Sequence, residues 1–146
     1  MDTNVLLYAY DKSEVTKQPV AQAALDRLWA DRTGAVSSQV LQEFYNAAMR
    51  KLLPPVSRAE AREIIDLHTA WPVVLLDAAV ILAATHIEER HQLSLWDALV
   101  IEAARVAGAD RLMTEDMQHG RVIEGVRIEN PFVTNAEPET SAMSGG

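Results

Sequence analysis

Short apolar runs alternate with longer stretches of helical periodicity along the chain. The apolar runs that predict strands are residues 35–37, 73–76, 111–114 and 125–128. Residues 5–10 fit either a strand or the first turns of a helix. Helical spacing of apolar side chains covers residues 19–31, 38–53, 57–70, 78–92 and 94–107. Strands interleaved with amphipathic helices predict an α/β fold of three layers, with a central, mostly parallel sheet flanked by helices.

Local signals mark several helix ends. Ser57 and Glu60 have the spacing of a capping box, in which each side chain satisfies a backbone N–H of the other residue. Ser94 has the position of an N-cap, and Gly108 follows the last helix where a left-handed residue commonly ends one. These signals indicate separate helices rather than one long one.

The composition narrows the class of protein. The chain has 146 residues, of which 49% are hydrophobic and 23% charged, as in an ordinary globular domain. It has no cysteine, which excludes disulfides, thiolate nucleophiles and cysteine-bound metals and fits a reducing compartment. The longest apolar run, residues 78–84, is far shorter than the ~20 residues of a membrane helix. No basic-then-apolar leader opens the chain, so we expect a cytoplasmic protein that does not bind membranes.

The charge balance argues against a simple nucleic-acid binder. Thirteen Lys and Arg residues stand against 21 Asp and Glu residues, giving a formal net charge of −8. Affinity for phosphates normally comes from a basic surface. An acidic chain is better suited to a site that gathers carboxylates around a metal ion.

Four acidic residues fall at or near the carboxyl edge of the predicted sheet, where α/β proteins place their functional crevice. They are Asp2, Glu43, Asp97 and Asp116. Carboxylates that converge in one crevice repel each other unless a cation neutralises them, and oxygen ligands favour hard cations such as Mg²⁺ or Mn²⁺. Such a site is suited to metal-assisted attack of water on a phosphodiester.

Each acid also has an ordinary structural interpretation. Asp97 completes a helix cap that begins at Ser94, and Glu43 could be a solvated helix residue. Asp116 could belong to a turn, and Asp2 to a frayed terminus. Taken singly, none of the four is specific evidence for a metal site.

Taken in order, four segments resemble the PIN-domain family, and within it the VapC-type toxin ribonucleases of VapBC toxin–antitoxin modules. The segments are DTNVLLYA at residues 2–9, SQVLQEF at 38–44, LSLWDAL at 93–99 and TEDMQHG at 114–120. The endings GVRI at 125–128 and NPF at 130–132 are similar as well. The resemblance implies a PIN-like nuclease domain over residues 1–133, and the apolar-poor residues 134–146 predict a disordered tail.

The resemblance also implies the chemistry. It implies a toxin endoribonuclease in which Asp2, Glu43, Asp97 and Asp116 are catalytic, with Asp2, Asp97 and Asp116 holding Mg²⁺ or Mn²⁺. Asn4 and Thr114 would orient these ligands. The partners it implies are an RNA substrate, a cognate VapB-type antitoxin and a second copy of the chain in a homodimer.

One departure concerns the start of the sequence. Members of the family usually place an apolar central strand before the first aspartate, whereas here only Met1 precedes Asp2. Either the true start lies upstream, or that strand is missing and Asp2 is poorly anchored. We expect an N-terminally extended chain to be more stable.

Other candidate residues carry weaker signals. Arg50 and Lys51, followed by Arg58 and Arg62, could line an RNA path or form a solvated helix face. The four histidines have no metal-ligand spacing, so we expect structural roles for them. We expect the three tryptophans, at positions 29, 71 and 96, to be core residues rather than platforms for base stacking.

Two other functions are excluded because the chain lacks a residue that each of them needs. A haloacid-dehalogenase phosphatase needs a second aspartate two positions after the first, where this chain has Asn4, and a receiver domain needs a late lysine, which is missing after Lys51. The alternative that stays open is a catalytically inactive PIN-like module that binds RNA or protein.

Overall fold

The computed structural model describes residues 1–133, and the tail predicted for residues 134–146 lies outside them. The helices are α1 (Thr3–Tyr10), α2 (Lys17–Asp31), α3 (Ser38–Lys51), α4 (Arg58–His68), α5 (Ala78–His91) and α6 (Leu95–Val106). The strands are β1 (Val36–Ser37), β2 (Val73–Val74), β3 (Arg111–Met113), β4 (Val122–Ile123) and β5 (Val126–Glu129). The mixture of helices and strands predicted from the sequence is confirmed, and the ambiguous residues 5–10 form a helix.

Side-chain caps account for the positions of the helix starts. Ser57 and Glu60 form both hydrogen bonds of the predicted capping box at α4. The Ser94 hydroxyl accepts from the Asp97 backbone N–H at the start of α6, and Gly108 adopts φ +74° just after its end. These local contacts fix boundaries that the apolar pattern gave only approximately.

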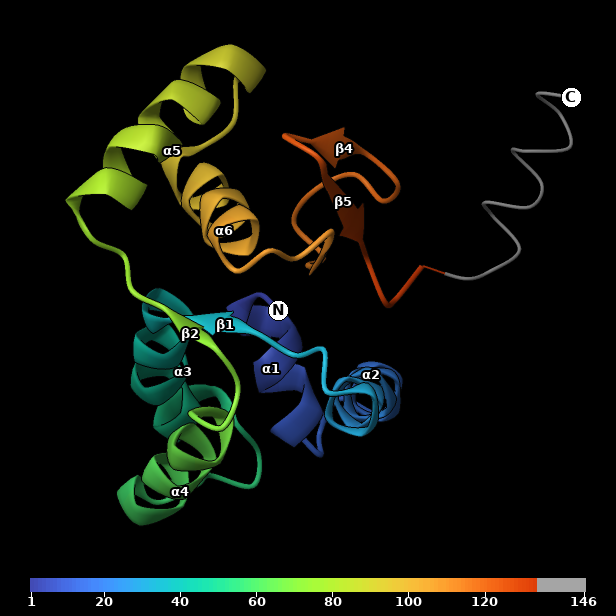
Figure 1. Ribbon diagram of the computed structural model, residues 1–146. Coiled ribbons are helices and arrows are strands. Elements are labelled where there is room, and N and C mark those ends of the chain that lie inside the picture. The colour runs from blue at the N-terminus through green and yellow to red at the C-terminus, as the bar shows by residue number, and fades with distance from the viewer. Residues whose placement is uncertain (134–146) are drawn as a thin grey trace, which may run out of the picture.

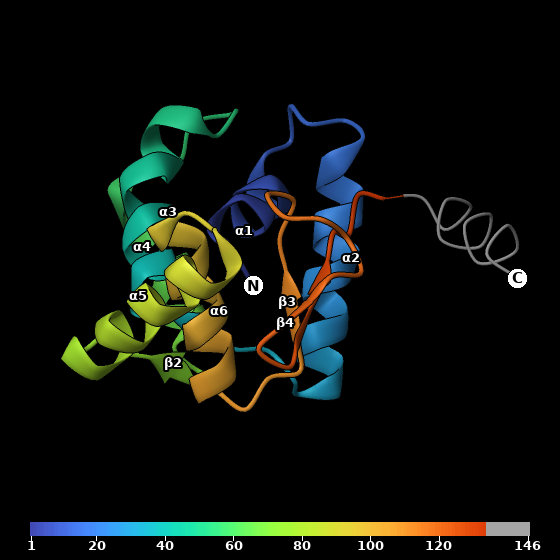
Figure 2. The same cartoon turned by 90° about the horizontal axis from the view of Figure 1, so that it is seen from above.

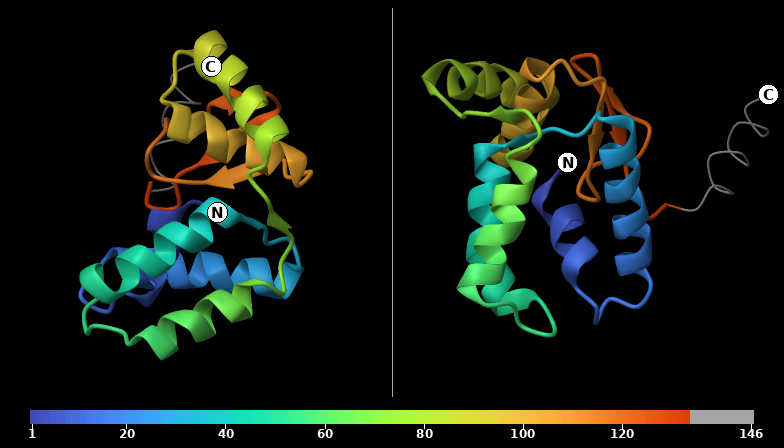
Figure 3. Two further views of the ribbon diagram at one scale, coloured as in Figure 1. Left: turned by 90° about the vertical axis from the view of Figure 1, so that its left-hand side faces the viewer. Right: turned by 60° about the horizontal axis from the view of Figure 1, so that its bottom comes forward.

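Two hydrophobic clusters form the core, one in each half of the molecule. One half contains α1 to α4 with β1 and β2, and Phe44 and Leu6 lie at its centre, fully buried. The other contains α5, α6 and the strands β3 to β5, centred on Ile101, Leu112 and Ile128. Figures 1 and 3 show the N-terminus at the junction between the halves.

The strands form two small sheets instead of the single central sheet that was predicted. β1 pairs with β2 in parallel, and β5 pairs with β3 in parallel and with β4 antiparallel. The reason for the break is that only Met1 and Asp2 lie between β1 and β3. The Met1 amino group donates to the Ala35 carbonyl (3.2 Å) and the Asp2 N–H donates to the Met113 carbonyl (2.9 Å).

An apolar cavity continues from this junction between the two sheets. Its lining includes Met1, Val36, Val74, Val100 and Leu112, contributed by both halves. The sheet edges at β1 and β3 therefore face each other across apolar side chains, and the two hydrogen bonds of Met1 and Asp2 bridge them.

Layering is clearest around the second sheet. In Figure 2 the strands β3 and β4 lie between α6 on one side and α2 on the other. This is a local helix–sheet–helix arrangement of the kind predicted, on a smaller sheet. Within residues 1–133, no helix has the length and apolar character that crossing a membrane requires.

The prediction of a core position was wrong for one tryptophan. Trp71 is buried and packs on Trp29 and His68, so close to Gly34 that a Cβ at position 34 would clash with the Trp71 ring. Trp96 is 65% exposed, because it lies in the first turn of α6 ahead of the buried stretch 98–103. His68 is fully buried among these aromatic rings, which is a structural role.

Candidate metal centre

Asp2 lies at the junction of the two halves as the N-cap of α1. Its side chain is 92% buried from solvent, with a relative exposure of 8%. One carboxylate oxygen accepts from the Thr3 N–H at 2.8 Å, and the other accepts from the Thr114 hydroxyl at 2.8 Å. The alternative in which Asp2 is poorly anchored is therefore wrong, because both of its carboxylate oxygens have fixed donors.

Thr114 joins Asp2 to Asp116. It is fully buried directly after β3, where its N–H donates to the Glu129 carbonyl at 3.0 Å. Besides donating to Asp2, its hydroxyl accepts from the Asp116 N–H at 3.1 Å. One side chain thereby orients the first and the last of the four predicted acids, although they come from opposite ends of the chain.

Asp97 reaches the same place from the first turn of α6. Its backbone N–H donates to the Ser94 hydroxyl at 3.1 Å, which holds the first turn in position. Two helix N-termini, those of α1 and α6, therefore meet near these acids, and the positive end of each helix dipole favours negative charge there.

The pKa values show that three carboxylates share one electrostatic environment. Partial burial, followed by repulsion from Asp2 and then from Asp97, raises the pKa of Asp116. Burial raises the pKa of Asp97 as well, with a further contribution from Asp2 that a hydrogen bond with Ser94 opposes. The structure thus brings Asp2, Asp97 and Asp116 together as mutually repelling groups.

Glu43 lies beside this group but is not one of the repelling acids named above. It is exposed on α3, and one carboxylate oxygen accepts from the Thr3 hydroxyl at 2.9 Å. Thr3 therefore hydrogen-bonds to both Asp2 and Glu43. The sequence interpretation expects Asn4, the next residue, to orient the acids. Asn4 is half-buried one position further along α1.

A fifth acid, which the sequence analysis did not select, stands between Thr114 and Asp116. Glu115 accepts from the Tyr8 hydroxyl at 2.9 Å and pairs with the Lys17 ammonium at 2.8 Å. Lys17 also lies over the rings of Tyr8 and Phe132, at 4.6 and 5.2 Å from their centroids. This Lys17–Glu115 clamp ties the loop after β3 to α1 and α2, and no local pattern signals it because 98 positions separate the ion pair.

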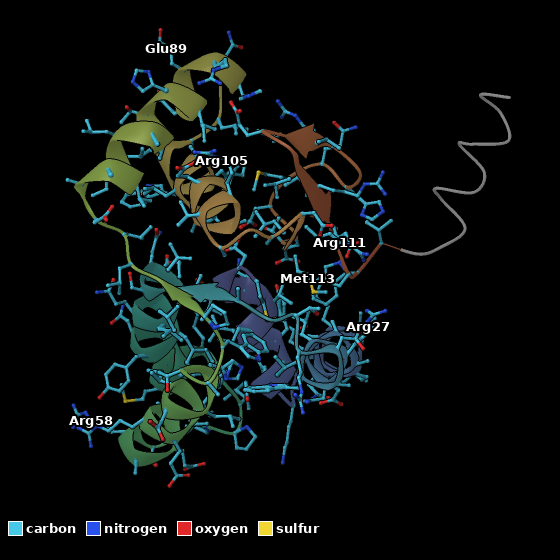
Figure 4. All side chains as sticks on the ribbon, viewed as in Figure 1. Arg27, Arg58, Glu89, Arg105, Arg111 and Met113 are labelled. Atoms are coloured by element: carbon cyan, nitrogen blue, oxygen red, sulfur yellow. The ribbon has the colours of Figure 1, made fainter. Side chains whose placement is uncertain are left out.

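The basic residues proposed as an RNA path lie elsewhere. Arg50 and Lys51 end α3, about 10 Å along the helix axis from Glu43 at 1.5 Å per residue. Figure 4 shows Arg58, at the start of α4, at the far end of the molecule from Met113, whose carbonyl binds the Asp2 N–H. The structure does not bring this basic cluster next to the acids.

A family comparison adds to this geometry. The family model described as PIN domain matches residues 1–124, which include all four predicted acids. The chain belongs to the PIN domain family. No curated protein matches the sequence. PIN domains are generally metal-dependent nucleases, which agrees with a group of carboxylates that repel each other.

The side chains of this PIN domain fit a hard divalent cation by their chemistry. All donors of the group are carboxylate oxygens, the ligand type that Mg²⁺ and Mn²⁺ take, and their repulsion leaves negative charge for a cation to neutralise. Within residues 1–133, no three acidic or histidine side chains form a ready-made ligand cage. Mg²⁺ usually keeps several waters and binds one or two carboxylates, so a closed cage is not required.

Proposed function

We propose that this PIN domain is a Mg²⁺- or Mn²⁺-dependent endoribonuclease, the VapC-type toxin of a type II toxin–antitoxin module. The single observation that carries the proposal is the position of the Thr114 hydroxyl, which donates to the Asp2 carboxylate and accepts from the Asp116 N–H and so holds two acids of a PIN domain together. Carboxylates held in mutual repulsion, with Thr114 fixing two of them, are costly to a fold. The presence of such mutually repelling carboxylates is explained if they bind a cation.

The roles of the residues follow from their contacts. Asp2, Asp97 and Asp116 would hold the cation, and Thr114 would keep Asp2 and Asp116 oriented. Glu43, which is connected to Asp2 through Thr3, would accept a proton from an attacking water. A bound divalent cation would neutralise phosphate charge and acidify water. Asn4 would support the first turn of α1.

The proposed partners follow from the same site. A group of carboxylates favours an arginine or lysine of a VapB-type antitoxin, through charge-assisted hydrogen bonds. We also propose a homodimer and a cytoplasmic location, the compartment in which a toxin of this type meets RNA. A small open reading frame directly upstream of the gene would support the antitoxin, and an isolated gene would favour a stand-alone nuclease.

A second candidate function has one observation in its favour. The exposed position of Glu43, together with the absence of a ligand cage within residues 1–133, suits a PIN domain that binds RNA or protein without cutting it. Metal-dependent turnover separates the two functions.

The test is cleavage of a labelled single-stranded RNA with Mn²⁺, with Mg²⁺ and with a chelator. Asp97→Asn keeps the shape of the side chain and the Ser94 cap while removing one charge from the group. Asp110→Asn is the matched control, because Asp110 is an exposed acid on the loop before β3. Cleavage that needs metal, is lost in Asp97→Asn and persists in Asp110→Asn would support the nuclease. Binding without any cleavage would support the second candidate.

A further inference from the structure

A groove runs between α2 and the second sheet. It has two adjoining compartments of about 510 and 410 Å³, and both are lined by Arg27, Met113 and Glu129. We call this cavity the α2 groove. Figure 4 shows Met113 between Arg111 and Arg27, which lie on the two walls of the smaller compartment. Sites for small molecules have volumes of roughly 300–1,000 Å³, so each compartment is large enough to hold a ligand.

The α2 groove is connected to the candidate metal centre through β3 and the loop that follows it. Met113 lines both compartments, and its backbone carbonyl accepts from the Asp2 N–H at 2.9 Å. His119 lines the larger compartment three positions after Asp116, so the Cα atoms of these two residues are at most about 11 Å apart. A strand of RNA bound at the acids can therefore reach the groove with a nucleotide that flanks the cut.

The larger compartment is mostly apolar and has few polar side chains. Its apolar lining residues are Pro19, Val20, Ala23, Ala24, Pro131 and Val133. The His119 Nδ1 accepts from the Asn130 backbone N–H at 3.0 Å, so the neutral ring carries its proton on Nε2 and keeps one donor for a ligand. Apolar walls with a few polar groups are typical of small-molecule sites, and they suit a nucleobase, which has apolar faces and a polar edge.

The smaller compartment has one guanidinium group that is available for a phosphate. Arg111 is paired with Glu129 at 3.2 Å and lies 3.9 Å from Asp110. Arg27 lies on the α2 wall and forms no ion pair within the part of the chain that the structure describes. Asp31, which lines the same compartment, adds negative charge. Because acids surround the two arginines, this compartment suits one phosphate rather than a run of several.

We propose that the α2 groove binds one nucleotide of the RNA beside the cut, with its base in the larger compartment and its phosphate at Arg27. The inference rests on the endoribonuclease function proposed above, and it makes the groove the part of the site that selects a base. The base is selected because the apolar walls limit its size and the His119 Nε2–H favours an acceptor on its edge.

The first experiment measures nucleotide binding without turnover. The chain is titrated in chelator with AMP, GMP, CMP, UMP and ribose 5-phosphate, and its backbone amide signals are followed by NMR. We expect the signals of residues 19–27 and of His119 to shift at millimolar concentrations, with unequal affinities for the four nucleotides and weaker binding of ribose 5-phosphate. Arg27→Gln should weaken the binding of each nucleotide about 2-fold to 5-fold, as expected for an exposed ion pair.

Ala23→Leu tests the larger compartment, because Ala23 is exposed on α2 and lines the groove. The added side chain should weaken nucleotide binding about 10-fold or more, since it takes space that the base needs. Ala30→Leu is the matched control, because Ala30 is an exposed alanine of the same helix that lines neither compartment. It should bind nucleotides as the unaltered chain does.

The second experiment measures base selection during cleavage. A pool of RNA of randomised sequence is cut in Mn²⁺, and the ends of the products are sequenced. The unaltered chain and Ala30→Leu should share a base preference at one position beside the cut. Ala23→Leu should still cut RNA but lose this preference.

Several results would overturn the inference. Nucleotides that shift no amide signal of the groove, or that bind Ala23→Leu unchanged, would show that the groove is not their site. The same base preference in Ala23→Leu would remove the groove from base selection and leave the nuclease intact. Groove signals that respond to removal of residues 134–146, or to protein concentration, but not to nucleotides would show another occupant. Nucleotide binding in the groove of a chain that cuts no RNA would support the nucleotide site and contradict the proposed function.

Discussion

The Thr114 hydroxyl donates a 2.8 Å hydrogen bond to the Asp2 carboxylate, although 112 positions separate the two residues. The same oxygen accepts from the Asp116 backbone, so one buried hydroxyl joins the first and last acids of the site. This contact crosses the junction of the two halves of the molecule, and it places the candidate metal centre at the point where they meet.

Replacing Thr114 tests this connection. Thr114→Val keeps the shape of the side chain but leaves a buried Asp2 oxygen and the Asp116 N–H without their partner. We expect a loss of about 1–3 kcal/mol in the free energy of unfolding, the usual cost of such unpaired groups. Thr114→Ser, which keeps the hydroxyl, should lose much less. Denaturant unfolding of both variants measures the difference, and equal losses would mean that the hydroxyl is unimportant.

Local features of this fold and of the site were predictable from the sequence. Helix starts at Ser57 and Ser94 were predictable because a cap acts within one turn. That Asp97 and Asp116 lie near Asp2 was predictable from the resemblance of their segments to the PIN-domain family. The Lys17–Glu115 pair was not, because it depends on how α2 and the loop after β3 meet in three dimensions.

Two sequence interpretations failed for physical reasons. A single sheet needs a paired strand between β1 and β3, and the two residues there supply only one hydrogen bond to each side. Trp96 reads as part of an apolar helix, yet the first turn of α6 projects beyond the core, so periodicity alone does not bury it.

Neutralising an acid of the group should stabilise the metal-free chain. The pKa values of Asp97 and Asp116 are raised in the folded state, so the folded chain holds protons more tightly than the unfolded chain. Stability therefore falls as pH rises from the ordinary value near 3.8 through the raised values, and the full penalty is present at neutral pH. Asp116→Asn removes part of it, which should raise the thermal midpoint at pH 7 in chelator by about 1–3 °C.

The control for this prediction is the pH profile. Asp116→Asn should gain least at low pH, where Asp116 of the unaltered chain is protonated in both the folded and the unfolded state. Asp110→Asn should show no such gain at pH 7. A lower midpoint for Asp116→Asn at pH 7 would contradict the repulsion inferred for the group.

The two residues of the Lys17–Glu115 clamp should shift the pKa of Asp116 in opposite directions. Glu115 is one of the groups that raise the Asp116 pKa, and Lys17 offsets its charge. Lys17→Met should therefore raise the Asp116 pKa further, while Glu115→Gln should lower it. Both variants break the same ion pair, so a purely structural effect would shift the Asp116 pKa in the same direction in both. Carboxyl NMR titration of the metal-free chain distinguishes these results.

The apolar cavity between β1 and β3 should accept a designed strand. Joining five residues rich in Val and Ile ahead of Met1 would place apolar side chains and backbone hydrogen-bonding groups between the two sheets. We expect the thermal midpoint to rise by roughly 3–7 °C, equivalent to about one or two kcal/mol at this chain length. A Gly- and Ser-rich extension of equal length is the control. Equal midpoints for the two extended chains would show that the cavity does not take a strand.

A titration with Mn²⁺ shows whether Asp2, Asp97 and Asp116 form one cation site. Electron paramagnetic resonance of free Mn²⁺ during titration gives the affinity without requiring cleavage. We expect the unaltered chain and Asp110→Asn to bind equally, and Asp97→Asn and Asp116→Asn to bind at least 10-fold more weakly. Equal affinity in all four chains, or no binding by the unaltered chain, would show that these three acids do not form one cation site.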